Sequence, residues 1–135
     1  MWSVDDSGRA IPIDVPGEPE GVLSVTPRAA GGAWLVGPRA LYRLDPFSER
    51  AIKVIDLAPT LRDQPFLPTL EGLVERGDGT VWICRDRRGL EVCDPETRAT
   101  RLLPARTAPG GVGGLSVSKL YEDRQGGLWL AVVGL

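Results

Sequence analysis

Residues 120–130 read LYEDRQGGLWL, and two earlier stretches repeat this phrase in altered form. Residues 73–83 read LVERGDGTVWI, and residues 25–35 read VTPRAAGGAWL. Each copy has an apolar strand start, a turn that contains glycine and a tryptophan just after the turn. The tryptophans recur at intervals of 48 and 47 residues, at Trp34, Trp82 and Trp129. A period of this size predicts a repeat architecture.

A second phrase recurs in step with the first. Residues 44–51 read LDPFSERA, residues 93–99 read CDPETRA and residues 4–10 read VDDSGRA. The N-terminal Trp2 therefore takes the position of Tyr42, on a different strand of the unit from the three repeated tryptophans. The chain is thus predicted to begin in the third strand of a unit.

The pattern between the repeated phrases is one of short strands and tight turns. No stretch has a convincing helical period, and short apolar runs between Gly, Asp and Pro signals indicate an all-β fold. Four strands in a unit of this length are typical of a β-propeller blade. The strands are expected at residues 2–5, 9–15, 22–25, 33–36, 41–44, 51–57, 72–75, 81–85, 90–93 and 99–103, with a final pair that begins near 115 and turns at 123–127.

The predicted units divide the chain into four parts. They are an outer half-blade at 1–21, blades at 22–71 and 72–114, and an inner half-blade at 115–135. About three blade-equivalents make a partial propeller, which does not close a ring alone. We therefore expect a fragment, an open solenoid-like piece or a part that associates through exposed strand edges.

Composition excludes several classes of protein. The 135 residues carry a net charge of −2 with both signs scattered, so no basic surface for nucleic acid is expected. The longest strongly apolar run, 128–133, is too short to span a bilayer, and no signal peptide is evident. Without histidine, and with only Cys84 and Cys93, a zinc site is not expected. A disulfide between these cysteines and two buried thiols both remain open, with buried thiols favoured. No cofactor is expected.

The repeat resembles the two-component regulator propeller repeat. That family has an aspartate, two residues and Gly-x-Leu-Trp, then Gly-Leu, then an aromatic before Asp-Pro-x-Thr-Gly. Residues 123–129 (DRQGGLW) and 94–97 (DPET) carry the likeness, and it extends over nearly the whole chain. The second copy departs from the pattern, with Cys84 where glycine is usual and Cys93 where an aromatic is usual.

The resemblance implies a ligand-sensing module of a bacterial signalling protein. Such repeats form periplasmic or other extracytoplasmic propellers that bind a small molecule or glycan and lie ahead of a cytoplasmic output domain. The partners implied are that ligand and either the remaining blades or a second copy. The resemblance assigns no catalysis to this chain.

Candidate ligand residues lie in loops that share one end of the predicted blades. Because a guanidinium group pairs well with carboxylates, we expect acidic groups of a ligand to bind there, although solvated turns are the simpler interpretation. The candidates are Arg62, Asp63, Arg85, Arg87 and Arg88. The glycine-rich segment 108–114 is interpreted as a blade connector rather than a phosphate loop, because no Lys or helix follows it.

The repeated aspartates and tryptophans are interpreted as structural. Asp45, Asp78, Asp94 and Asp123 match acid–base chemistry in residue type, but their recurrence favours turn formation. Recurrence likewise favours blade packing over sugar stacking for the three tryptophans. Two alternative functions remain: a propeller enzyme similar to streptogramin lyases, which would need a histidine base that this chain lacks, and a scaffold for protein contacts.

Overall fold

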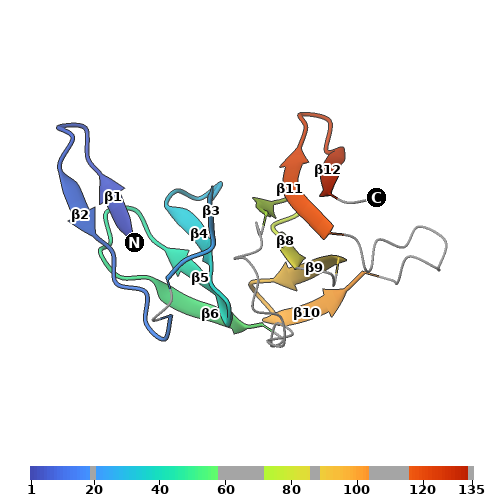
Figure 1. Cartoon of the computed structure of the whole chain (residues 1–135), viewed down its shortest axis with the longest axis horizontal. Helices are drawn as coiled ribbons and strands as arrows, with labels where there is room; N and C mark the ends of the chain where they lie inside the picture. Colours follow the sequence, from blue (N-terminus) through green and yellow to red (C-terminus); the bar gives the residue numbers. More distant parts are fainter. Residues whose placement is uncertain (19–20, 58–71, 86–88, 104–115, 134–135) are drawn as a thin grey trace.

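The chain folds entirely as β-strands and turns in the parts that the structure describes. The computed structural model describes residues 1–18, 21–57, 72–85, 89–103 and 116–133. It contains two four-stranded sheets and two two-stranded hairpins, arranged in chain order from one end of the molecule to the other (Figure 1). Within the described ranges, no helix is long and apolar enough to cross a membrane.

The first four-stranded sheet is an antiparallel meander with its strands in sequence order. It comprises β3 (Ser24–Pro27), β4 (Ala33–Val36), β5 (Ala40–Leu44) and β6 (Ile52–Asp56). Its tight connections allow neighbouring strands to pair directly. In the register, Trp34 lies opposite Arg43 and Leu35 opposite Tyr42.

The second four-stranded sheet repeats this order. It comprises β7 (Leu73–Glu75), β8 (Val81–Arg85), β9 (Gly89–Asp94) and β10 (Ala99–Leu102). Trp82 lies opposite Val92 and Ile83 opposite Glu91, so the repeated tryptophan has the same place in both sheets. The repeat positions assigned from the tryptophans in the sequence therefore match the strand positions in the two sheets.

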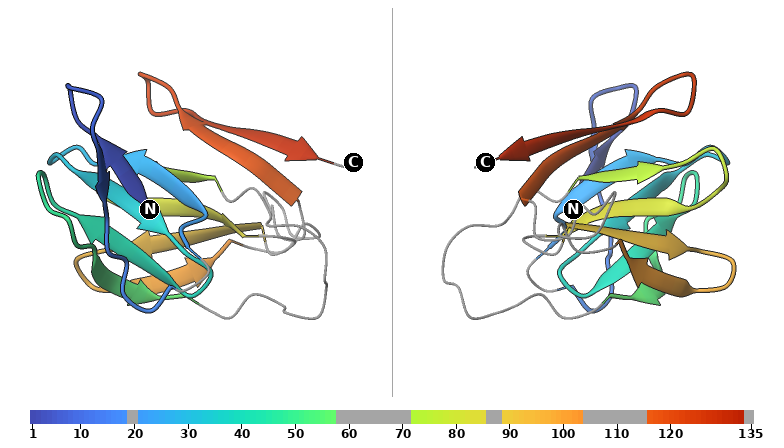
Figure 2. Two further views of the ribbon diagram at one scale, coloured as in Figure 1. Left: turned by 60° about the vertical axis from the view of Figure 1, so that its left-hand side comes forward. Right: turned by 90° about the vertical axis from the view of Figure 1, so that its right-hand side faces the viewer.

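A hairpin lies at each end of this pair of sheets. One consists of β1 (Trp2–Val4) and β2 (Ala10–Pro12), and the other of β11 (Ser116–Glu122) and β12 (Leu128–Val133). Among the described strands, β12 pairs with β11 and with no other (Figure 2). Each hairpin has two strands, and its assignment as a half-unit of a blade remains a prediction.

Three apolar layers hold the elements together, because alternate residues of a strand point to opposite faces of its sheet. The layer beside β1–β2 contains Leu35, Ala40, Tyr42 and Ala51. The layer between the two four-stranded sheets contains Trp34, Val36, Leu41, Ile55, Leu57, Leu73, Val81, Ile83 and Cys93. The layer beside β11–β12 contains Cys84, Leu90 and Leu120. Both faces of each four-stranded sheet are therefore apolar, as stacked blades require.

The two cysteines lie on opposite faces of the second sheet. Cys84 is buried in the layer beside β11–β12, and Cys93 in the layer between the sheets. They are not register partners, because Cys84 pairs with Leu90 and Cys93 with Val81. The structure therefore has two buried thiols and no disulfide between them.

Among the described residues, two turns hold a residue other than glycine at positive φ. Phe47 has φ 62° and Arg98 has φ 60°. Arg98 follows Thr97 in the DPET turn, where the propeller pattern quoted above has glycine. The left-handed region costs a residue with a Cβ about 1–2 kcal/mol, so this turn is strained.

The strand expected at 9–15 is shorter than the pattern predicts. β2 ends at Pro12, although the amide of Ile13 still donates to Met1 O at 2.8 Å. Asp14 then leaves the hairpin and forms a parallel bridge with Arg50, in the connection between β5 and β6. The chain changes partners at this point, which shortens the strand. β3 likewise begins at Ser24, two residues later than expected.

Candidate functional site

Most of the predicted ligand residues lie outside the described residues. Arg62, Asp63, Arg87 and Arg88 fall in the ranges 58–71 and 86–88, and the glycine-rich 108–114 falls in 104–115. Arg85 is the last residue of β8, and its side chain also lies outside the described part. Arrangement of these residues into one binding surface therefore remains a prediction.

In the first sheet, Glu18 lies at the end that corresponds to these candidate loops. Glu18 is only 6% exposed, and its Oε1 accepts a hydrogen bond of 3.1 Å from the Arg39 amide. A Cβ at Gly37 would lie 2.5 Å from the Glu18 carboxyl carbon. The carboxylate thus fits against a backbone without a side chain and holds the turn that joins β4 to β5.

Tyr42 lies beside this carboxylate. Its hydroxyl donates to Pro16 O at 2.8 Å. Burial, followed by the negative charge of Glu18, raises the pKa of Tyr42 to about 12. Tyr42 therefore stays protonated near neutral pH and acts as a hydrogen-bond donor rather than a base. The arrangement locks loop 16–18 to the first sheet and leaves Arg39 exposed at this end.

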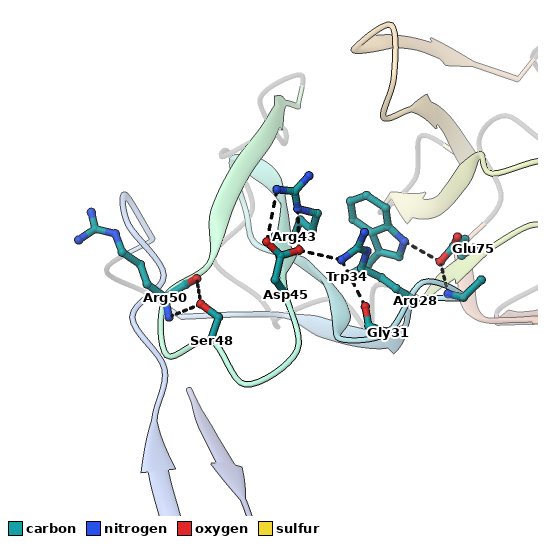
Figure 3. Close-up of polar contacts among 9 residues, drawn as sticks. Arg28, Gly31, Trp34, Arg43, Asp45, Ser48, Arg50 and Glu75 are labelled. Carbon is teal, nitrogen blue, oxygen red and sulfur yellow. Dashed lines mark hydrogen bonds and ion pairs between the residues drawn. The ribbon is translucent and has the colours of Figure 1, made fainter.

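A second polar group joins the two four-stranded sheets at the opposite end. Glu75 Oε2, at the end of β7, accepts from Trp34 Nε1 at 2.8 Å and from the Ala29 amide at 3.0 Å (Figure 3). Trp34 is 5% exposed, so its indole N–H needs a partner within the protein. The carboxylate of one sheet therefore satisfies a buried donor of the other.

Arg28 and Asp45 form an ion pair beside this contact. Arg28 Nη1 lies 3.0 Å from Asp45 Oδ1, and Arg43 Nε lies 3.0 Å from the same oxygen. The Arg28 guanidinium also stacks on Trp34, 5.0 Å from the ring centroid, and donates to Gly31 O (Figure 3). In this copy, the side chain of Asp45 pairs with two arginines.

In the second repeat the arginine makes the contact with β11, and the Trp82 indole N–H instead donates to Thr80 Oγ1 at 2.9 Å. Arg76, 48 residues after Arg28, stacks on Trp82 at 4.8 Å. Its Nε lies 3.3 Å from Glu122 Oε2, and its Nη2 donates to Gly126 O at 2.7 Å. Glu122 stands at the position of Glu75 and also binds the preceding unit, through Arg76 rather than through the tryptophan.

The third repeat differs because Asp123 replaces the arginine. Its Oδ2 accepts from Trp129 Nε1 at 2.8 Å, and its Oδ1 accepts from the amides of Gln125 and Gly127. These hydrogen bonds, led by that from Trp129, lower the pKa of Asp123 below 3.8. The indole N–H is therefore satisfied within its own hairpin.

The remaining turn aspartates accept hydrogen bonds from their own loops. Asp78 accepts from the amide and hydroxyl of Thr80, and these bonds lower its pKa below 3.8. Asp94 accepts from the amides of Glu96 and Thr97. These contacts stabilise turns. Across the described ranges, no three His, Cys, Asp or Glu side chains are grouped to hold a metal ion.

Sequence reasoning missed the two glutamates that bind the preceding unit. Glu75 and Glu122 both stand third in the phrase that begins LVE or LYE, so their recurrence was a usable signal. Their partners lie more than 40 residues away, at Ala29, Trp34 and Arg76. Buried Glu18 has no counterpart in the quoted phrases and gave no such signal.

Comparison with known proteins gives a likeness among solved structures. No protein-family model matches the chain, and no curated protein matches it. Among solved structures, it is similar to the extracellular domain of BT3049 from B. thetaiotaomicron, assigned to the hybrid two-component systems. The TM-score is 0.58 at 19% sequence identity, over 87% of this chain and 16% of the other.

At this identity the likeness concerns the fold. The chain is all-β, with four-stranded antiparallel blades of the propeller type, as the repeats predict. It spans about a sixth of the length of the neighbour, whose own title describes an extracellular domain. The described residues thus form a partial propeller that is similar in fold to part of that extracellular domain.

Proposed function

We propose that this chain is a ligand-sensing part of an extracytoplasmic propeller in a bacterial signalling protein of the two-component type, without catalysis of its own. The observation that carries the proposal is the blade arrangement, together with its likeness to the extracellular domain of a hybrid two-component system. The propeller phrase at residues 123–129 and 94–97 supports the same assignment.

The ligand surface is assigned to the end of the blades where the second strand of each sheet connects to the third. Loop 16–18 and the turn 37–39 lie there in the first sheet, held by Glu18 and Tyr42, and they expose Arg39. The predicted arginines Arg62, Arg85, Arg87 and Arg88 belong to the corresponding loops along the chain. Since guanidinium groups bind carboxylates well, the proposed ligand is an acidic oligosaccharide or another small carboxylate.

Neither alternative function is favoured by an observation in the described residues. A streptogramin-lyase-like enzyme would use a histidine base, and the sequence contains none. A scaffold for protein contacts would use the same exposed loops. Ligand titration separates sensing from scaffolding, because a scaffold has no small-molecule ligand.

The test is calorimetric titration of the full chain with galacturonate oligomers, with neutral galactose oligomers for comparison. Binding of the acidic oligomers alone is expected, with loss of binding in an Arg87→Ala/Arg88→Ala variant. A matched control is Arg101→Ala/Arg124→Ala, which removes the same charge from exposed positions outside the ligand loops. Absence of binding, or equal loss in both variants, would refute the proposed surface.

A further inference from the structure

The two glutamates that bind the preceding unit lie at equivalent places. Glu75 Oε2 accepts a hydrogen bond from the Ala29 amide at 3.0 Å, and Glu122 Oε1 accepts one from the Gly77 amide at 3.5 Å. Ala29 and Gly77 are 48 residues apart, so each carboxylate lies on the equivalent turn of the preceding unit. We call the contact made by Glu75 the first joint and the contact made by Glu122 the second joint. The two joints can be compared position by position.

The second partner of the carboxylate differs between the joints. At the first joint, Glu75 Oε2 also accepts from Trp34 Nε1 at 2.8 Å (Figure 3). At the second joint, Glu122 Oε2 lies 3.3 Å from Arg76 Nε. An arginine is present at both joints, since Arg28 stacks on Trp34 at 5.0 Å and Arg76 stacks on its own tryptophan at 4.8 Å. The first joint thus uses the indole, and the second uses the guanidinium.

The residue two positions before the tryptophan also differs between the two units. It is Gly32 in the first unit and Thr80 in the second. Thr80 Oγ1 accepts from Trp82 Nε1 at 2.9 Å and donates to Asp78 Oδ1 at 2.6 Å, so a hydrogen-bonded chain ends at a carboxylate within one turn. Glycine has no side chain that could accept from the Trp34 N–H. Because that indole is only 5% exposed, it needs an acceptor from the next sheet.

Glu122 retains the capacity to accept a further hydrogen bond. Its Oε2 is buried and accepts no hydrogen bond among the described residues, although the guanidinium lies close to it. The Trp82 N–H is therefore kept from this oxygen by its own acceptor, the Thr80 hydroxyl, and not by the lack of an acceptor across the joint. Without that hydroxyl, Trp82 would have in Glu122 the acceptor that Trp34 has in Glu75.

We propose that the Thr80 hydroxyl selects the contact at the second joint. It holds the Trp82 N–H within the turn and so leaves Glu122 to the guanidinium of Arg76. The second joint is then an ion pair between side chains that are 21% and 16% exposed. At the first joint, Gly32 provides no such acceptor, and the indole takes the carboxylate. The inference concerns contacts between units and does not depend on the proposed ligand.

The selection makes the two joints respond differently to salt. Salt screens the attraction between partly exposed charges, because the Debye length falls from about 10 Å at about 0.1 M to about 3 Å at about 1 M. The hydrogen bond from the Trp34 indole to Glu75 joins a charge to a neutral group that is 5% exposed, so there is no charge pair to screen. High salt should therefore weaken the polar contact of the second joint and spare that of the first.

The test is a set of double-mutant cycles in the full chain, measured by urea denaturation. In the native chain, Arg76→Met and Glu122→Met should couple by about fivefold in the unfolding equilibrium constant, and Trp82→Phe and Glu122→Met should not couple. In a Thr80→Val background, which removes the hydroxyl at nearly constant volume, the coupling should transfer to Trp82 and Glu122. Thr80→Ser keeps a hydroxyl and should keep the native pattern. Thr100→Val, the same change at an exposed strand position, is the matched control.

A second measurement follows the indole directly. The chain has four tryptophans, so a nitrogen–proton correlation spectrum has four indole signals, and Trp82→Phe identifies the signal of Trp82. In Thr80→Val this signal should move to higher proton frequency, because a carboxylate is a stronger acceptor than a hydroxyl, and adding Glu122→Met should reverse the shift. Far-ultraviolet circular dichroism confirms that each variant is folded. A folded Thr80→Val variant that is less stable but keeps the native coupling pattern would reduce Thr80 to a structural role and overturn the proposal.

A competing explanation assigns the selection to Asp45, which pairs with Arg28 at 3.0 Å and could hold it away from Glu75. In an Asp45→Asn background, the proposal expects the coupling between Trp34 and Glu75 to persist. Its replacement by a coupling between Arg28 and Glu75 would overturn the proposal. So would a native coupling at the second joint that is absent, or one that does not fall between about 0.1 M and about 1 M salt.

Discussion

Replacing Glu75 with alanine would test whether one carboxylate holds the two four-stranded sheets together. Glu75 Oε2 accepts from Trp34 Nε1 at 2.8 Å and from the Ala29 amide at 3.0 Å. The indole is 5% exposed and has little access to water once the carboxylate is gone. The Ala29 amide belongs to an exposed residue and can be solvated. The loss should therefore come mainly from the indole.

A hydrogen bond to a charged group contributes about 1.5–3 kcal/mol, so Glu75→Ala should lower the free energy of unfolding by about 2 kcal/mol. Urea slopes for small domains are about 1–3 kcal/mol per molar, which predicts a midpoint lower by about 1 M. The assay is urea denaturation followed by tryptophan fluorescence. All variants are compared at one protomer concentration, because association changes apparent stability.

A double-mutant cycle with Trp34→Phe isolates the bond, because phenylalanine keeps an aromatic ring and lacks the N–H. The coupling free energy between the two substitutions should be about 1–2 kcal/mol. The control Glu96→Ala, at an exposed turn residue, should change stability by less than about 0.5 kcal/mol. A Glu75→Ala variant as stable as that control, or zero coupling in the cycle, would refute the role assigned to Glu75.

Three further predictions concern turns and thiols. Hydrogen bonds lower the pKa of Asp123 below 3.8 in the folded chain, so its contribution to stability is complete above 3.8 and is lost as pH falls through the lowered value. Asp123→Asn should therefore reduce the fall of Tm with decreasing pH in the acid range. Gly32→Ala should destabilise the chain, since Gly32 has φ 75° and an added Cβ would overlap a backbone carbonyl of the neighbouring strand. Arg98→Gly should stabilise the chain by about 1 kcal/mol in urea denaturation, because glycine adopts positive φ without the cost that a Cβ adds. Cys84 and Cys93 should react with a thiol reagent only in denaturant, and a reductant should leave Tm unchanged, because both are buried on opposite faces.

Each of these has an outcome that contradicts it. An Asp123→Asn variant with the acid limb of the native chain would show that the lowered pKa does not contribute to stability. Equal stabilities of the native chain and Arg98→Gly would mean that the turn is not strained. Rapid labelling of either cysteine without denaturant would contradict the packing of the second sheet.

The sequence predicted strands and turns well where one residue type repeats for a local reason. Asp78 and Gly79 define a turn by hydrogen bonds and φ within a few residues, and Asp123 and Gly126 define the turn of the third copy in the same local way, although Asp123 stands at the position of Arg76. The phase of the units also followed from the tryptophan positions. These features depend on neighbours in the chain, so the pattern itself contains them.

Features that depend on distant partners were not predictable in the same way. Asp45 resembles the turn aspartates in sequence, yet Arg28, 17 residues earlier, pairs with its carboxylate. Trp129 was predicted to pack between blades and is largely exposed, because among the described residues no sheet follows its hairpin. Asp14 changes partners to reach Arg50, which no local pattern indicates. The five candidate ligand residues remain predictions.

Apart from the bridge between Asp14 and Arg50, backbone pairing of the described strands stays within each sheet, and this has a consequence for how such a chain folds and evolves. The most widely separated register partners of any sheet, Ser116 and Val133, are 17 residues apart. Between the two four-stranded sheets, the described hydrogen bonds run through a side chain, that of Glu75. Each meander can therefore form from a short stretch of chain with little loop-closure entropy, and a duplicated or deleted unit needs new side-chain contacts at one face but no rethreading of strands. The near-constant interval between the tryptophans is what such duplication leaves behind.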